Sequence, residues 1–90
     1  MFEFQWHNSF RKAFKKLSIN NDLKVRIIQT LELLQINPFD RRLKTHKLHG
    51  ELKNLYACSI DFDYRIVFSF SKTESNTIIL VDIGTHNEVY

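Results

Sequence analysis

The first half of the chain changes from an alternating to a helical pattern of hydrophobic residues. In residues 2–6, aromatic and polar side chains alternate, which predicts a half-buried strand. In residues 7–17, apolar side chains recur at the spacing of one helix face, with Asn8 or Ser9 as the expected N-cap. The apolar face of this predicted helix comprises Phe10, Ala13, Phe14 and Leu17.

A second helix is predicted from about Leu23 to Ile36, and its apolar stripe again has helical spacing. Pro38 ends it, because the residue before a proline is biased away from helical geometry. Only a short polar segment, SINND, separates the two helices. A connection of this length predicts an antiparallel helical hairpin.

The second half of the chain changes to a period of two. Strands are expected at roughly Leu52–Ile60, Tyr64–Phe70 and Thr77–Ile83, with the turn-rich segments DFD and SKTESN between them. The order β-α-α-β-β-β predicts an α+β fold. In this fold the N-terminal helical hairpin packs on an antiparallel β-sheet and leaves another face or edge of the sheet open. Residues 1–90 are too few for two hydrophobic cores, so we expect a single domain.

Composition excludes several classes of function. With two glycines in 90 residues, a glycine-rich phosphate loop is not possible, and no HExxH or paired-cysteine motif is present. We therefore expect neither a cofactor nor a bound metal. One cysteine, no signal-peptide pattern and no long apolar run predict a cytoplasmic protein without a membrane partner. The net charge of +3 favours an anionic partner without specifying one.

Residues suited to acid–base and phosphate chemistry concentrate after the predicted helices. His46 precedes the second predicted strand, Arg65 lies within the third, and His86 follows the last. Because neighbouring antiparallel strands bring distant residues together, these three side chains are expected on one surface. Other polar candidates in this half are His49, Lys53, Asp63, Tyr64 and Tyr90.

The chemistry that suits such a set is RNA cleavage. A pair of histidines titrating near neutral pH can act as base and acid, and an arginine matches the oxygens of a phosphate. An aromatic ring can stack on an unpaired base. Plainer interpretations remain open at this stage: solvated surface histidines, Arg65 paired with Asp61 or Asp63, and Tyr90 as a frayed terminus.

Two segments carry a resemblance to a known family. LHGELKNLYACSIDFDYRIVF and the closing IGTHNEVY, in this element order, resemble the RelE/ParE superfamily of type II toxins, most closely its YafQ-type branch. The resemblance implies a RelE-like fold and a ribosome-dependent mRNA endoribonuclease that needs no metal. It also implies neutralisation by a cognate antitoxin, through which the complex binds operator DNA.

Residue by residue, the resemblance implies His46 as the general base, His86 as the general acid and Arg65 as the group that contacts the phosphate. Relatives of this branch often carry a further histidine where this chain has Ser59. His49 is an additional histidine that either compensates for that loss or is incidental. The implied catalytic set is His46, Asp63, Arg65, His86 and Tyr90, and the implied RNA contacts are Lys44, His49, Lys53 and Tyr64.

Two alternatives come from other functional classes. ParE-type toxins share this fold and inhibit DNA gyrase by binding it. A catalytically degenerate toxin retained to bind its antitoxin is the other alternative, and the serine at position 59 favours it. The paired histidines favour the nuclease, because a gyrase-binding surface does not need acid–base groups.

Overall fold

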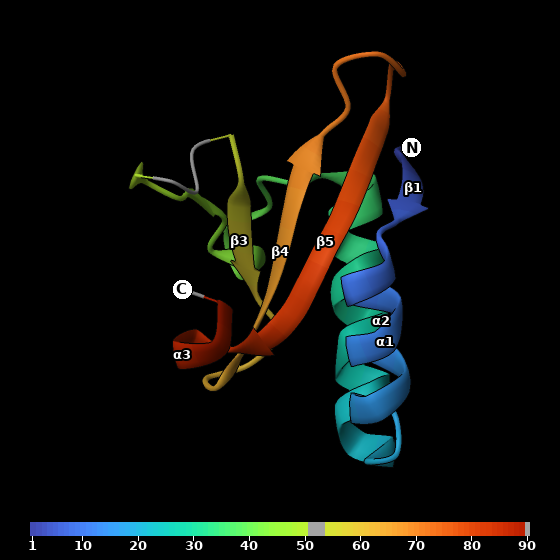
Figure 1. The fold of residues 1–90 in the computed structure, drawn as a ribbon, viewed down its shortest axis with the longest axis vertical. Helices are drawn as coiled ribbons and strands as arrows, with labels where there is room; N and C mark the ends of the chain where they lie inside the picture. The colour runs from blue at the N-terminus through green and yellow to red at the C-terminus, as the bar shows by residue number, and fades with distance from the viewer. Residues whose placement is uncertain (51–53, 90) are drawn as a thin grey trace.

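A computed structural model describes residues 1–50 and 54–89. Two long helices pack on a five-stranded mixed sheet, as Figure 1 shows. The predicted α+β fold with an N-terminal helical hairpin is thereby confirmed. The elements are β1 (Glu3–Trp6), α1 (Asn8–Leu17), α2 (Asn21–Ile36), the 3₁₀ turn η1 (Arg41–Leu43), β2 (His46–Lys47), β3 (Tyr56–Ser59), β4 (Tyr64–Phe70), β5 (Thr77–Thr85) and α3 (His86–Val89).

Both long helices begin earlier than the apolar pattern predicts. The N-cap of α1 is His7 and not Asn8 or Ser9, because its backbone is extended and its imidazole Nδ1 accepts the Ser9 N–H at 3.2 Å. Asn20 caps α2 in the usual way, with its side-chain oxygen accepting the Leu23 N–H at 3.0 Å. Polar capping residues lie outside the apolar stripe, which is why the stripe alone places the helix start too late.

The sheet has the strand order β1-β5-β4-β3-β2. The antiparallel prediction is correct for β2 to β5, whereas β1 pairs with β5 in parallel at the opposite edge. Strand β1 is followed by α1 and not by a hairpin, so no tight turn imposes an antiparallel partner on it. The strand predicted from about Leu52 has its described part at Tyr56–Ser59, and residue 52 lies outside the described residues. Strand β2 and helix α3 were not predicted.

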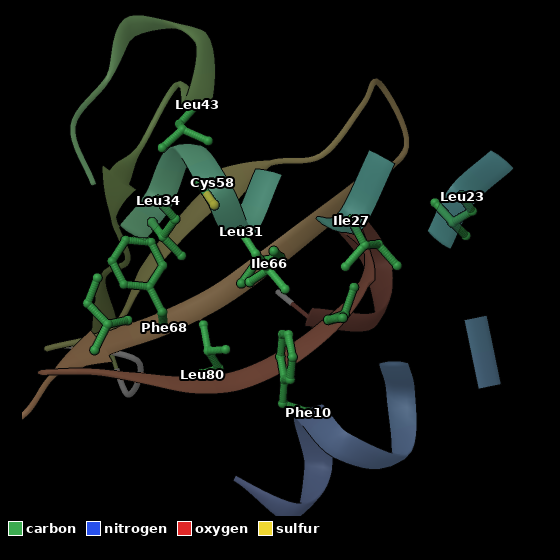
Figure 2. Packing of buried hydrophobic residues seen from close by; sticks show 12 residues of the cluster. Phe10, Leu23, Ile27, Leu31, Leu34, Leu43, Cys58, Ile66, Phe68 and Leu80 are labelled. Carbon is green, nitrogen blue, oxygen red and sulfur yellow. The ribbon is translucent and has the colours of Figure 1, made fainter. Parts of the chain in front are cut away.

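The main core lies between the sheet and the two long helices (Figure 2). Alternate residues of β4, such as Ile66 and Phe68, point into it and are fully buried. Cys58 on β3 belongs to the same core, and its burial raises the pKa of the thiol to about 12. The buried set is Phe10, Leu23, Ile27, Leu31, Leu34, Leu43, Cys58, Ile66, Phe68, Ile78, Leu80 and Ile83.

The other side of the sheet, here called the open face, carries a second and much smaller apolar cluster. Leu48, Ala57 and Val67 form its buried centre, and Val89 of α3 packs against it. Helix α3 therefore lies on the opposite side of the sheet from α1 and α2 (Figure 1). Within residues 1–50 and 54–89, no helix is long and apolar enough to cross a membrane.

Candidate active site on the open face

The turn between β3 and β4 is fixed by one carboxylate. Oδ1 of Asp61 accepts the backbone N–H groups of Asp63 at 2.9 Å and of Tyr64 at 2.8 Å. Oδ2 of Asp61 forms an ion pair with Nε of Arg26 on α2 at 3.2 Å. Asp61 therefore stabilises the turn by hydrogen bonds within it and connects it to α2 by an ion pair.

Arg65 completes this turn from the open face. Its Nη1 donates to the backbone oxygens of Asp61 at 2.8 Å, Tyr64 at 3.0 Å and Phe62 at 3.2 Å. These are the only hydrogen bonds that the side chain of Arg65 makes with the described part of the chain, so Nε and Nη2 take no part in them. The alternative in which Arg65 pairs with a turn carboxylate is wrong, since it bonds the carbonyl oxygens instead.

Two pockets meet at Arg65 and Phe62. The first has a volume of about 420 Å³ and the second about 390 Å³. Arg65 therefore lies on the wall that separates two adjacent hollows. The first is lined by Phe62, Asp63, Arg65, Thr85, His86 and Asn87; the second is lined by Arg42, Lys44, Ser59, Ile60, Asp61, Phe62 and Arg65.

Positive charge dominates the second pocket. Arg42 forms two hydrogen bonds with the carboxylate of Asp40, at 3.0 Å from Nε and 2.9 Å from Nη2, and these hold the pKa of Asp40 at about 2. The charge of Arg42 is therefore balanced locally. Lys44, in the left-handed conformation that ends η1, and Arg65 supply the remaining positive charge of this pocket.

His46 reaches the same face from β2. It is paired with Ala57, whose side chain belongs to the open-face cluster, and directly opposed residues share a face. Ser59 lies two residues beyond Ala57 and is directly opposite Arg65 on β4. His46 is exposed, and its Nδ1 lies 3.3 Å from the carbonyl oxygen of Lys44. Strand β3 lies between His46 and Arg65, and His46 lines neither of the two pockets at Arg65.

His86 reaches the site from the other side of Arg65. Gly84 on β5 is directly opposite Arg65, and His86 follows two residues later as the first residue of α3. His86 is exposed and lines the first pocket together with Arg65 and Asp63. In the order of the strands, Arg65 therefore lies between His46 and His86.

The remaining predicted residues divide into several groups. Asp63 and Lys44 line the pockets on either side of Arg65, as a shared site requires. Tyr64 is next to Arg65 in sequence but packs against the helix-side core, so an RNA contact from its ring is not supported.

His49 is exposed after β2 and lines neither pocket. Lys53 and Tyr90 lie outside the described residues.

Two residues of the site were missed from the sequence. Both belong to the segment DFD, in which Asp61 was considered only as a possible partner of Arg65 and Phe62 only as part of a turn. The signal was present, because an aspartate that begins a tight turn commonly accepts hydrogen bonds from the backbone two and three residues later. An aromatic residue at a polar hairpin tip was the second signal.

Comparison with known proteins defines the class of this protein. Residues 2–90 match the model of the YafQ family, described as bacterial toxins of type II toxin–antitoxin systems. The chain belongs to this family and is a type II toxin, which confirms the resemblance seen in its sequence. No curated protein sequence matches the chain.

Solved structures share the fold over nearly the whole chain. A metal-bound toxin from Helicobacter pylori is 32% identical, with 100% of both chains covered and a TM-score of 0.80. YafQ from E. coli strain BL21(DE3) is 15% identical, with 100% of this chain and 99% of that chain covered and a TM-score of 0.81. A chain of the YoeB–YefM complex from Staphylococcus aureus is 19% identical, with 96% of this chain and 98% of that chain covered and a TM-score of 0.76. Among the described residues of this chain, no group of three or more His, Cys, Asp or Glu is placed to hold a metal ion.

Proposed function

We propose that this toxin is an endoribonuclease that cleaves mRNA on the ribosome in the cytoplasm. The observation that carries the proposal is the position of Arg65 on the open face, between the strand that bears His46 and the helix that begins with His86. A cation between two histidines suits in-line transfer at a phosphodiester, because one histidine can act as the base, the other as the acid, and the cation can bind the phosphate. The pockets on both sides of Arg65 offer space for the nucleotides that flank the bond.

The proposed reaction uses the ribose 2′-hydroxyl as the nucleophile. His46 accepts its proton while the bond from the 2′-oxygen to phosphorus forms. The bond from phosphorus to the 5′-oxygen breaks, and His86 donates a proton to that leaving oxygen. The products are a 2′,3′-cyclic phosphate and a 5′-hydroxyl, so the reaction consumes no water and no co-reactant.

Arg65 is the proposed phosphate ligand. Since Nη1 is held by three carbonyl oxygens, Nε and Nη2 are the donors that remain for two phosphate oxygens. The turn therefore fixes the guanidinium before RNA arrives, which lowers the cost of organising the transition state. Asp63 shares the first pocket with His86, and its carboxylate is a suitable acceptor for the ring of His86 or for a ribose hydroxyl.

Exposure of the site supports a role for larger partners. His46, His86 and Asp63 are all exposed, so the toxin alone does little to exclude water or to orient a flexible RNA. The ribosome would supply that orientation by holding the mRNA in one geometry. We further propose a cognate antitoxin as the neutralising partner, through which the complex binds operator DNA. The solved YoeB–YefM complex supports the antitoxin partner.

The test compares wild type with His86→Ala on ribosomes programmed with a defined mRNA. Loss of a general acid should reduce the rate about 10²–10⁴-fold, and the wild-type products should carry 5′-hydroxyl and cyclic phosphate ends. Lys72→Ala is the control, because Lys72 is an exposed residue of the β4–β5 connection that lines neither pocket, and it should cleave like wild type.

Three outcomes would contradict the proposal. Intact mRNA together with inhibited DNA gyrase would indicate a ParE-like function. Intact mRNA with tight antitoxin binding and no other activity would indicate a degenerate toxin. Equal losses in His86→Ala and Lys72→Ala would show that the loss is not specific to the pocket containing His86.

A further inference from the structure

Phe62 is an aromatic side chain held in solvent at the tip of the β3–β4 turn. It is 93% exposed, more than any other large hydrophobic residue in the described part of the chain. Exposed apolar residues are common on protein surfaces, so exposure alone assigns no role. Its surroundings distinguish it from the other exposed apolar residues.

The backbone beneath Phe62 is fixed. The carboxylate of Asp61 accepts the two N–H groups that follow Phe62, and Arg65 donates to the carbonyl oxygen of Phe62 itself. The ion pair of Asp61 with Arg26 connects the turn to α2. The ring is therefore attached to a rigid turn, and a ligand that contacts it pays little to order the backbone.

Phe62 and Arg65 are the two residues shared by both pockets. A phosphate held by Arg65 would thus have the ring of Phe62 beside it, at the boundary between the positions of two successive nucleotides. The neighbouring side chains are charged and polar, with Lys44 and Ser59 in one pocket and Asp63 and His86 in the other. Such surroundings suit a nucleotide better than an apolar peptide segment.

We propose that Phe62 is the base-stacking platform of the site and holds the base of a nucleotide next to the scissile phosphate. This inference rests on the proposed function and names the contact by which single-stranded RNA is positioned. Every base has a face on which a ring can stack, so Phe62 contributes affinity and register for all four bases. The ring also limits the motion of the nucleotide whose 2′-hydroxyl attacks.

The first experiment measures kcat/KM for cleavage of ribosome-bound mRNA by four proteins: wild type, Phe62→Ala, Phe62→Leu and Phe62→Trp. Loss of one stacked base should lower kcat/KM roughly 5- to 150-fold in Phe62→Ala. Phe62→Leu, which keeps apolar volume without a ring, should lose nearly as much, and Phe62→Trp should stay near wild type. All variants should fold, because only the backbone of Phe62 takes part in the hydrogen bonds of the turn.

A second measurement does not depend on cleavage. A fluorescent 2-aminopurine base is placed on either side of the cut in mRNA bound to ribosomes, and His86→Ala is added so that the RNA stays intact. Stacking should quench the fluorescence at one of the two positions, and adding Phe62→Ala to His86→Ala should abolish the quenching. If wild type does not cleave but this quenching is seen, the proposed reaction fails and the stacking contact stands.

Other results would overturn the inference. Full activity in Phe62→Ala, or in Phe62→Leu, would show that no aromatic stacking occurs. Quenching that is unchanged by Phe62→Ala would show the same. Weaker antitoxin binding by Phe62→Ala with undiminished cleavage would show that the ring is an anchor for a protein partner.

Discussion

Two replacements of Asp61, by alanine and by asparagine, separate the contribution of its hydrogen bonds in the β3–β4 turn from the contribution of its ion pair with Arg26. Asp61→Ala removes the acceptor of two backbone N–H groups, each worth about 0.5–1.5 kcal/mol in the free energy of unfolding. It also removes the ion pair with Arg26, whose side chains are 47% and 26% exposed and which contributes about 0.2–1 kcal/mol. The expected loss is therefore about 1–4 kcal/mol.

Asp61→Asn is the matched variant. The amide oxygen of asparagine can accept the same two N–H groups, so only the ion pair is lost and the expected cost is about 0.2–1 kcal/mol. In a domain of this size each kcal/mol lowers Tm by about 4–8 °C. Thermal denaturation followed by circular dichroism should therefore show a drop of a few degrees for Asp61→Asn and of roughly 5–30 °C for Asp61→Ala.

Asp63→Ala serves as the control for this pair of variants. Its exposed carboxylate takes part in no hydrogen bond with the described residues, so its free energy of unfolding should stay within about 0.5 kcal/mol of wild type. Equal losses in Asp61→Asn and Asp61→Ala would refute the reasoning, because the charge and not the turn would then carry the stability. A loss in Asp63→Ala as large as in Asp61→Ala would also refute it.

Three further predictions concern the site and the two cores. Arg65→Lys should lower both the Tm and the rate of mRNA cleavage, because one ammonium group cannot bond three carbonyl oxygens and a phosphate at the same time. A Tm and a cleavage rate equal to those of wild type would contradict this prediction. Val89→Asp should strongly reduce the rate of cleavage but lower Tm only slightly, because Val89 packs against the open-face cluster and not against the main core. A large drop in Tm would show that α3 contributes to the main core. Between pH 9 and 12 the Cys58 thiol ionises in the unfolded chain but stays protonated in the folded one, so stability should fall by about 1.4 kcal/mol per pH unit. Cys58→Ala should lack this contribution, and an unchanged alkaline slope in a urea titration would count against burial of the thiol.

The sequence predicted those elements whose patterns are long enough to be periodic. The bounds of β4 agree with the prediction, Tyr64–Phe70, and both long helices were identified. Strand β2 has two residues and α3 has four, too few to show any period. The parallel pairing of β1 could not be predicted either, because it depends on how the helical hairpin returns the chain and not on a local pattern.

Site residues that are recognised by their side-chain chemistry could be predicted from the sequence. Site residues that are recognised only by their position in the folded chain could not. Histidine and arginine are recognisable by type, and the structure places His86 and Arg65 around one pocket. Tyr64 shows the limit of reasoning by type, because an alternating strand sends neighbouring residues to opposite faces. The turn role of Asp61 had a signal in the sequence, but the two pockets that Phe62 lines are formed only in the folded chain.

The small apolar cluster on the open face can unfold locally without unfolding of the main core, because the two clusters are separate. Leu48 follows the strand that bears His46, and Val89 ends the helix that begins with His86, so both histidines are held by the same few apolar contacts. Segments with little buried surface open more often than the rest of a protein. Local opening of this cluster would separate the two histidines while the main core stays folded. Among the described residues, three side chains form the buried centre of this cluster, so a few apolar contacts would set the fraction of time for which a toxin with an intact main core is inactive.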